Sequence, residues 1–225
     1  MSNTKPYDGN VTPGDAPATR DLGVARLSKL SVSGMHNNVY LLTDAATGQA
    51  LLVDAANDWP QIAAMIDADG GKVTQIATTH RHADHTGALA DAVTATGART
   101  LAGADDADHL PVPVDVPLAD GDRVQVGQVR LDVIHLRGHT PGSIALALTD
   151  ADGRAHVLTG DSLFPGGVGA TDHYDYQSFP QLIDDVEQRL FGRYDDSTWI
   201  YPGHGNDTTL GTERAQLPQW RARGW

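Results

Sequence analysis

The stretch Thr79-His80-Arg81-His82-Ala83-Asp84-His85-Thr86-Gly87 contains three histidines and one aspartate within six residues. It directly follows segment 72–79, which has the composition of a β-strand. Imidazole nitrogens and carboxylate oxygens are the usual protein ligands of divalent metal ions. A loop after a strand has no ladder of backbone hydrogen bonds to complete, so it can fold around an ion. A single histidine is more often a core or surface residue, but this density predicts a metal-binding loop.

Three further candidate ligands follow, each next to a glycine and just beyond a predicted strand. They are His139 in the stretch GHTPGS, Asp161 in TGDSLF and His204 in YPGHG. Glycine lets the backbone approach closely and lets a neighbouring side chain project from a tight turn. If the ends of these strands lie along one edge of a sheet, the three side chains converge with the loop that begins at His80.

The composition limits what this chain can do. Its 225 residues include 29 acidic and 16 basic side chains, and the net charge of −13 would repel a phosphate backbone, so we expect no nucleic-acid partner. The absence of cysteine excludes disulfides, thiolate nucleophiles and thiolate metal ligands. The apolar runs are too short to span a bilayer, and the first residues lack the apolar core of a secretory signal. We therefore expect a soluble cytoplasmic protein without a membrane partner.

Strands and helices alternate along the chain. Turn-forming residues predict hairpins between segments 39–42 and 51–53, 124–126 and 129–136, and 143–149 and 155–159, which favours an α/β fold with a mixed sheet. Residues 1–20 are rich in proline, glycine, aspartate and threonine, and we expect them to form a flexible N-terminal tail before a single metallo-hydrolase domain at 21–225. The predicted strands are 22–32, 39–42, 51–53, 72–79, 124–126, 129–136, 143–149, 155–159 and 197–201. The predicted helices are 59–68, 86–96 and 179–191, and the C-terminal segment with Trp220 and Trp225 is expected to dock on the domain.

The motifs resemble those of the metallo-β-lactamase superfamily and occur in the same order. Residues 80–85 match its H-x-H-x-D-H motif in full, and the later matches are G-H-T-P-G, G-D-x-L-F and P-G-H-G. The resemblance extends from about Val39 to Arg214. It implies a four-layer αββα sandwich, the metallo-β-lactamase fold, with metals at one edge of the two sheets.

The resemblance also implies ligands for two divalent metal ions. The first ion is expected on His80, His82 and His139, the second on Asp84, His85 and His204, and Asp161 is expected to bridge them. Zinc is the usual ion for such sites, although imidazole and carboxylate also suit iron and manganese. A metal lowers the pKa of bound water from ~15.7 to ~7, so a hydroxide between two ions can attack a carbonyl at neutral pH. Asp84 is placed both to bind an ion and to orient that hydroxide.

The aspartate at 161 favours one branch of the superfamily. The true β-lactamase branch carries a different ligand in this motif, often cysteine, whereas the glyoxalase II group carries the bridging aspartate in G-D-x-L-F. The chain thus resembles compact glyoxalase II-like (hydroxyacylglutathione hydrolase-like) hydrolases. This implies hydrolysis of a small-thiol thioester, acyl or formyl, to the acid and the free thiol. The segment after His204 is too short for the helical domain with which full-length glyoxalase II holds glutathione. Abundant alanine and aspartate, common in high-GC actinobacteria, make mycothiol another candidate carrier.

Three alternatives remain open from the sequence. A persulfide dioxygenase resembles the chain at residues 82–85 and would use one iron on His80, His139 and Asp161, but Ala170 replaces the arginine of that branch. A lactone hydrolase shares all of the metal ligands. A metal-binding domain without turnover is disfavoured, because a structural site is closed and rarely dinuclear. The sequence leaves the oligomeric state open.

Four residues outside the ligand set are candidates for substrate contact. His36 precedes a predicted strand, in a loop that lies near the metals in the family. His173, Tyr174 and Tyr176 lie in a long segment between Asp161 and the predicted helix 179–191. Long loops beside a site often carry its specificity.

Overall fold

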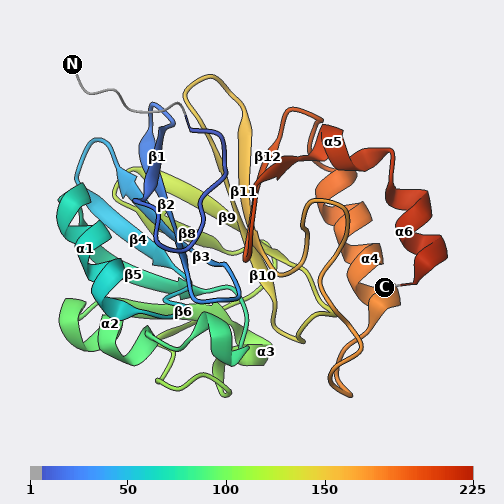
Figure 1. Cartoon of the computed structure of the whole chain (residues 1–225), viewed down its shortest axis with the longest axis horizontal. Coiled ribbons are helices and arrows are strands. Elements are labelled where there is room, and N and C mark those ends of the chain that lie inside the picture. The colour runs from blue at the N-terminus through green and yellow to red at the C-terminus, as the bar shows by residue number, and fades with distance from the viewer. Residues whose placement is uncertain (1–6, 225) are drawn as a thin grey trace.

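The computed structural model describes residues 7–224, which form two β-sheets flanked by helices (Figure 1). The strands are β1 (Ala18–Asp21), β2 (Ala25–Val32), β3 (Asn37–Asp44), β4 (Gln49–Val53), β5 (Lys72–Thr78), β6 (Arg99–Gly103), β7 (Val116–Leu118), β8 (Arg123–Val126), β9 (Val129–His135), β10 (Ile144–Thr149), β11 (Ala155–Gly160), β12 (Trp199–Pro202) and β13 (Thr208–Thr209). The helices are α1 (Trp59–Asp69), α2 (Leu89–Thr96), α3 (Ala104–Ala107), α4 (Phe179–Val186), α5 (Leu210–Arg214) and α6 (Leu217–Arg223). A 3₁₀ turn spans Ala83–His85, and a π-helical turn, Glu187–Phe191, continues α4.

The first sheet contains β1 to β7 in sequence order. β1 to β4 pair antiparallel, and β5, β6 and β7 then join in parallel. The predicted hairpin between β3 and β4 is confirmed, and it turns at Gly48, whose φ of 70° suits glycine. Helices α1 and α2 provide the crossovers into β5 and β6 that parallel pairing requires. As a result, β4 and β5 end at the same edge of the sheet.

The second sheet has the order β13-β12-β11-β10-β9-β8. Its predicted hairpins, β8–β9 and β10–β11, are confirmed as antiparallel pairs. β9 and β11 run in the same direction because both pair antiparallel with β10, and β12 is parallel to β11. The C-terminal ends of β9, β11 and β12 therefore lie at one edge of this sheet.

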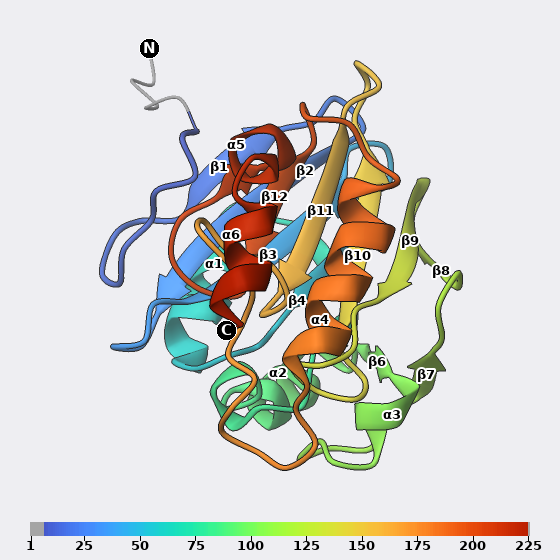
Figure 2. The same ribbon diagram turned by 90° about the vertical axis from the view of Figure 1, so that its right-hand side faces the viewer.

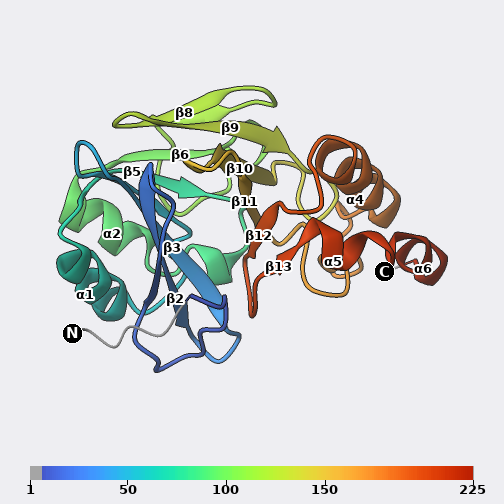
Figure 3. The same cartoon turned by 90° about the horizontal axis from the view of Figure 1, so that it is seen from above.

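The layers stack as helices, sheet, sheet and helices, which confirms the predicted four-layer αββα sandwich (Figure 3). Ile62 of α1 and Leu89 of α2 pack against the outer face of the first sheet. Leu182 of α4 and Trp220 of α6 pack against the outer face of the second, where Figure 2 shows both helices in front of the strands. The inner core between the sheets includes Leu27, Leu51, Leu131 and Leu146.

The N-terminal segment differs from the predicted tail. β1 begins at Ala18 and pairs with β2, so the sheet starts before residue 20. Val11 is buried, and Tyr7 packs against the inner core. The composition of this segment hides these contacts, because each apolar residue stands alone among turn-forming ones. Residues 1–6 lie outside the described part of the chain.

Residues 99–118 contain three elements that the sequence does not predict, namely β6, α3 and β7. β6 is short and rich in small residues, and Pro117 lies within β7, so neither has a strong strand signal. The predicted docking of the C-terminal segment is confirmed for Trp220, which is buried beside Phe191, whereas Trp225 lies outside the described residues. Within residues 7–224, no helix has the length and apolar character needed to cross a membrane.

Candidate metal centre

The candidate ligands lie just beyond the C-terminal ends of strands from both sheets. β5 of the first sheet leads into the loop 79–87, and β9, β11 and β12 of the second lead to the other ligands. The ends of these strands meet along one edge of the sandwich, and the structure brings all the predicted ligands together there. They form three overlapping groups with the spacing of a metal site: His80, His82 and His139; His80, His85 and Asp161; Asp84, His85 and His204.

In the second predicted group, Asp84, His85 and His204, the two Nε2 atoms face each other. Nε2 of His85 and Nε2 of His204 lie 3.1 Å apart, and Oδ2 of Asp84 lies 3.5 Å and 3.3 Å from them. Nδ1 of His85 donates to Asp54 at 3.0 Å, and Nδ1 of His204 donates to the carbonyl of Met35 at 2.9 Å. Because each Nδ1 carries a proton, the two Nε2 atoms need a cation or a further proton between them. This arrangement fits a metal ion.

The first predicted group, His80, His82 and His139, is a cluster of three imidazole rings. The ring centroid of His80 lies 4.8 Å from that of His82 and 4.9 Å from that of His139, and the centroids of His82 and His139 lie 4.6 Å apart. Nδ1 of His139 donates to the carbonyl of Ala170 at 2.8 Å, and Nδ1 of His80 lies 3.0 Å from the hydroxyl of Thr79. These outer hydrogen bonds leave Nε2 of both rings for an ion, as is usual for metal-binding histidines.

Asp161 lies between the two groups. Its Oδ1 is 3.3 Å from Nε2 of His85, and its Oδ2 is 3.3 Å, 3.6 Å and 4.0 Å from Nε2 of His204, His139 and His80. Three buried atoms of the described structure have no hydrogen-bond partner here: Nε2 of His80, Nε2 of His139 and Oδ1 of Asp161. A buried polar atom without a partner costs about 1–3 kcal/mol. A metal ion bound to these atoms would remove that cost, so the residues fit one.

The first group has the protonation state that a metal requires. Burial lowers the pKa of His80, His82 and His139, and that of His82 falls to about 4. All three imidazoles are therefore neutral at neutral pH. A neutral imidazole has the lone pair that binds a metal, so an ion can bind here without displacing a proton.

The second group differs, because nearby carboxylates raise the pKa of both of its histidines, His85 and His204. Burial lowers the pKa of His204, but hydrogen bonds to Asp161 and Asp84 outweigh it and raise the pKa to about 10. Burial would raise the pKa of Asp161, but His85 and His204 hold it well below its usual range. A metal ion that binds this group must therefore displace protons from imidazole.

Asp54 supports the His80 loop, and the sequence analysis did not identify it. It directly follows β4 with a left-handed φ of 56°. Its carboxylate accepts the N–H and the hydroxyl of Thr79, both at 2.7 Å, and Nδ1 of His85 at 3.0 Å. The pattern that identified the ligands could also have identified Asp54, because Asp54 is an aspartate directly after a strand.

Asp106 joins the two loops that supply the first group, and it too was missed. It is fully buried and accepts the N–H of Arg81, the hydroxyl of Thr140 and the N–H of Gly142. It lies in the Ala-Asp-Asp-Ala stretch of α3, which has the composition of a solvated turn. The sequence offers no signal for its role.

Two glycines next to the cluster leave room for Asp161. An added Cβ at Gly203 would lie 2.0 Å from Oδ1 of Asp161 and 2.8 Å from Cε1 of His85. An added Cβ at Gly169 would lie 1.9 Å from the carbonyl oxygen of Asp161. Close backbone approach is therefore the reason for glycine at both positions.

Two of the predicted substrate contacts, Tyr174 and Tyr176, lie against a candidate ligand. The ring of Tyr174 stacks on that of His82 with centroids 5.3 Å apart. The hydroxyl of Tyr176 lies 2.9 Å from Nε2 of His82, which leaves Nδ1 of this histidine for an ion. The two tyrosines stack on each other at 5.0 Å, and the guanidinium of Arg81 lies 4.1 Å from the ring of Tyr176.

The other two candidates, His36 and His173, lie at the surface. His36 is exposed, and its carbonyl accepts the N–H of Gly205, next to His204. Its left-handed φ of 59° is uncommon for a residue other than glycine. His173 lies 3.5 Å from the exposed Asp172.

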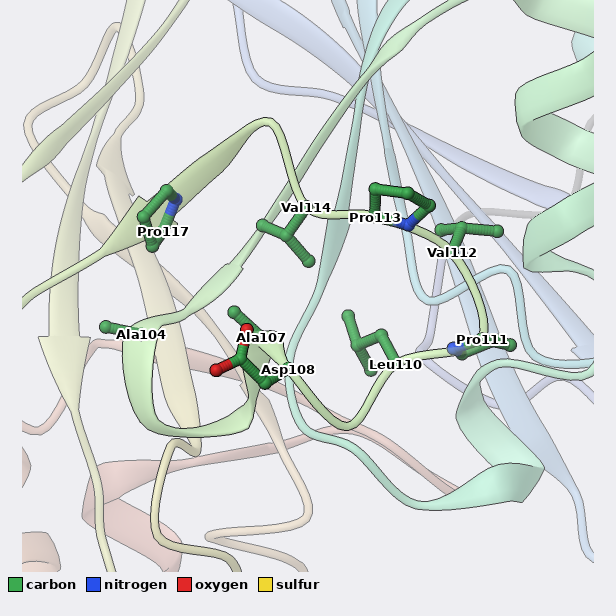
Figure 4. A pocket seen from close by; sticks show the side chains of 9 residues that line it. All are labelled: Ala104, Ala107, Asp108, Leu110, Pro111, Val112, Pro113, Val114 and Pro117. Atoms are coloured by element: carbon green, nitrogen blue, oxygen red, sulfur yellow. The ribbon is translucent and has the colours of Figure 1, made fainter.

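A separate cavity of about 630 Å³ shares no residue with the cluster (Figure 4). It is lined by Ala104, Ala107, Asp108, Leu110, Pro111, Val112, Pro113, Val114 and Pro117. Asp108 is its one titratable side chain, so this cavity lacks the groups that catalysis needs.

Comparison with known families agrees with this geometry. Residues 32–204 match the metallo-beta-lactamase superfamily, and these residues include every ligand of the cluster. The chain belongs to this superfamily. It is 42% identical over 133 residues to the hydroxyacylglutathione hydrolase of Cereibacter sphaeroides, covering 59% of this chain and 50% of that one. The chain spans about half the length of the first curated relatives that it matches.

Two solved structures in this superfamily are similar over most of their length. ETHE1 from Myxococcus xanthus is 30% identical with a TM-score of 0.77, covering 87% of this chain and 84% of that one. TTHA1623, solved in a di-iron-bound form, is 30% identical with a TM-score of 0.70, covering 83% of this chain and 96% of that one.

Proposed function

We propose that this protein is a hydrolase with two divalent metal ions that cleaves the thioester of a small thiol to a carboxylic acid and the free thiol. The observation that carries the proposal is the meeting of the predicted ligands from both sheets in one cluster. The similarity to hydroxyacylglutathione hydrolases supports a thioester as substrate. Because the similarity covers about half of each relative, it supports the reaction more than the identity of the thiol.

Asp84 is the residue to which we assign the orientation of the attacking water. When bound, zinc, iron or manganese ions would supply a hydroxide at neutral pH and polarise the substrate carbonyl. Burial would raise the pKa of Asp84, but hydrogen bonds with His204 and Asn37 keep it below its usual value. Nδ2 of Asn37 donates to Oδ2 of Asp84 at 2.9 Å and to its carbonyl at 3.1 Å. The carboxylate is thus ionised and fixed in orientation.

The rim of the cluster offers apolar surface for the substrate. Two large hydrophobic residues among 7–224 are exposed: Met35 exposes 62% of its surface to solvent, and Tyr174 exposes 54%. Both residues adjoin candidate ligands. The backbone carbonyl of Met35 accepts a hydrogen bond from Nδ1 of His204, and the ring of Tyr174 stacks on that of His82. Exposed apolar surface beside convergent polar groups is typical of a ligand site. We assign contact with the acyl or thiol group to Tyr174 and Tyr176, with His36 and His173 as outer candidates.

The test combines the metal content of the purified protein with a panel of acyl thioesters, lactones and β-lactams. We expect two metal equivalents per chain and the highest kcat/KM on thioesters. Dominant lactone hydrolysis would replace the thioester in the proposal. A fully metal-loaded protein that turns over none of the panel would support a binding domain without catalysis.

A persulfide dioxygenase with a single iron ion is the second candidate function. The specific observation in its favour is that the unpartnered buried atoms of the cluster belong to His80, His139 and Asp161, the ligands expected for that iron. The similarity to ETHE1 supports the same candidate. Against it, the ligands of a second ion are complete, and Ala170 replaces the expected arginine. One iron per chain, with oxygen consumed when a persulfide is added, would select the dioxygenase.

A further inference from the structure

Lys29 of β2 is a fully buried lysine whose ammonium protons all have acceptors. Nζ donates to the carbonyl oxygens of Gly9 at 2.8 Å and Gly205 at 2.7 Å, and to Oδ1 of Asp207 at 2.7 Å. Neither side chain of the Lys29–Asp207 pair is exposed to solvent. A buried ion pair pays a desolvation cost that apolar residues of the same volume avoid. Its presence here calls for a role besides stability.

Asp207 connects this lysine to the N-terminal segment 7–9. Its Oδ2 accepts the hydroxyl of Tyr7 at 2.7 Å and the indole N–H of Trp199 at 2.8 Å. The N–H of Asp207 donates to the carbonyl of Gly9 at 3.3 Å. Gly9 has a φ of 78°, and an added Cβ there would lie 2.6 Å from Cβ of Asp207. Segment 7–9 and residues 205–207 are therefore in close backbone contact.

The same contacts fix the residue that follows His204. The carbonyl of Gly205 accepts from Lys29 and from Nδ2 of Asn38, the latter at 2.9 Å. The N–H of Gly205 donates to the carbonyl of His36 at 3.0 Å. Each polar group of the Gly205 backbone thus has a defined partner, and the backbone in turn sets where the imidazole of His204 points.

The first metal group does not depend on this network. His80 and His139 follow β5 and β9, and their loops are joined by Asp106 and supported by Asp54. A displacement of residues 205–207 would therefore move His204 and leave the first group in place. The positioning role can therefore be measured as a loss of affinity for the second ion while affinity for the first ion is unchanged.

We propose that Lys29 and Asp207 are positioning residues for His204, and that the N-terminal segment 7–9 acts as a strap that completes their hydrogen bonds. The inference rests on the proposed dinuclear centre and concerns its second ion. With the strap in contact, the Gly205 carbonyl is held and His204 faces His85. Without the Lys29 hydrogen bonds, Gly205 keeps its contacts with Asn38 and His36, but residues 205–207 are held less firmly and the second ion is bound more weakly.

The test is the zinc stoichiometry of full-length wild type, Lys29→Met and Tyr7→Phe, measured by elemental analysis after dialysis and by zinc titration. Lys29→Met removes the three donated hydrogen bonds but leaves Asp207 paired with Tyr7 and Trp199. We expect its affinity for the second zinc to fall by at least about tenfold, with the first zinc retained. Tyr7→Phe removes one hydroxyl from the strap, so we expect a smaller loss of the same zinc.

Arg26→Met is the matched control, because Arg26 lies on the same strand and pairs with Asp69 at 3.0 Å, away from the ligands. We expect it to retain both zinc ions. Folded Lys29→Met and Tyr7→Phe proteins with wild-type affinity for both ions would overturn the inference and leave the dinuclear centre standing. A wild-type protein that holds one zinc would overturn the dinuclear centre and the inference with it. If Lys29→Met does not fold, the zinc affinity of Tyr7→Phe alone tests the inference.

Discussion

The hydroxyl of Thr140 donates a hydrogen bond of 2.5 Å to Oδ2 of Asp106, and this contact ties the loop of His139 to the loop of His80. The same carboxylate accepts the N–H of Arg81 at 3.1 Å and that of Gly142 at 3.0 Å. Asp106 is fully buried, so water cannot replace these bonds when they are lost. One carboxylate therefore fixes the distance between ligands that come from different sheets.

Replacing Asp106 by alanine should destabilise the metal-free protein. Two backbone N–H groups and one hydroxyl would lose their acceptor inside the domain, and we expect the free energy of unfolding to fall by about 3 kcal/mol. Urea unfolding in the presence of a chelator measures this loss. Asp105→Ala, at an exposed neighbouring position of α3, is the control and should cost much less. Equal losses for both variants would contradict the role assigned to Asp106.

Replacing Asp84 by alanine should nearly abolish hydrolysis without unfolding the protein. The carboxylate is partly exposed and lies at a loop, so its removal leaves the core intact. We expect kcat/KM to fall by about 100-fold or more, because the attacking water loses its orienting group. Activity on the best thioester and the far-ultraviolet circular dichroism spectrum check the two halves of this prediction. Asp91→Ala, which removes an exposed carboxylate on α2, should keep normal activity. Near wild-type turnover of Asp84→Ala would refute the assignment.

The two metal groups should respond differently to pH. At neutral pH and above, the histidines of the first group are already neutral, since burial lowers their pKa, that of His82 to about 4. His204, whose pKa is raised to about 10, is protonated at neutral pH and must release its proton to bind a metal. Between pH 7 and 9, affinity for the first ion should stay nearly constant, and affinity for the second should rise as pH rises. Zinc titrations at three pH values measure this, and parallel changes at both groups would contradict it.

Replacing Gly203 by alanine should disrupt the centre by steric exclusion. The added Cβ would lie 2.0 Å from Oδ1 of Asp161, and backbone or ligand must shift to admit it. We expect loss of bound metal and of activity, visible in elemental analysis. Gly34→Ala is the control in a nearby loop, because nothing lies within 4 Å of its added Cβ. Full metal content in Gly203→Ala would show that the site adapts more readily than its geometry indicates.

The sequence identifies the residues that form the cluster, because they lie within short motifs at strand ends. His80 to His85 are close in sequence, and the later ligands each follow a strand and adjoin glycine. The hairpins and amphipathic helices were predictable for a similar reason, since their signals are local. Convergence of the ligands follows once the strand directions are known.

The residues that support the site escape such analysis because their partners are distant in sequence. Asp106 contacts Thr140, and Lys29 contacts Asp207, across many intervening residues. Nothing in the local pattern around Asp106 or Lys29 distinguishes them from solvated charges. The predicted tail shows the same limit, because Tyr7 gains its contacts only when residues 199–207 are in place.

The ligands of the centre come from both sheets, and the last of them, His204, lies near the C-terminal end of the described chain. During synthesis, the first sheet can form while the second is still inside the ribosome. The nascent chain then presents His80, His82, Asp84 and His85 without their counterparts. The complete cluster therefore has to wait for the synthesis of β12 and His204, and a product truncated before His204 would hold metal only loosely.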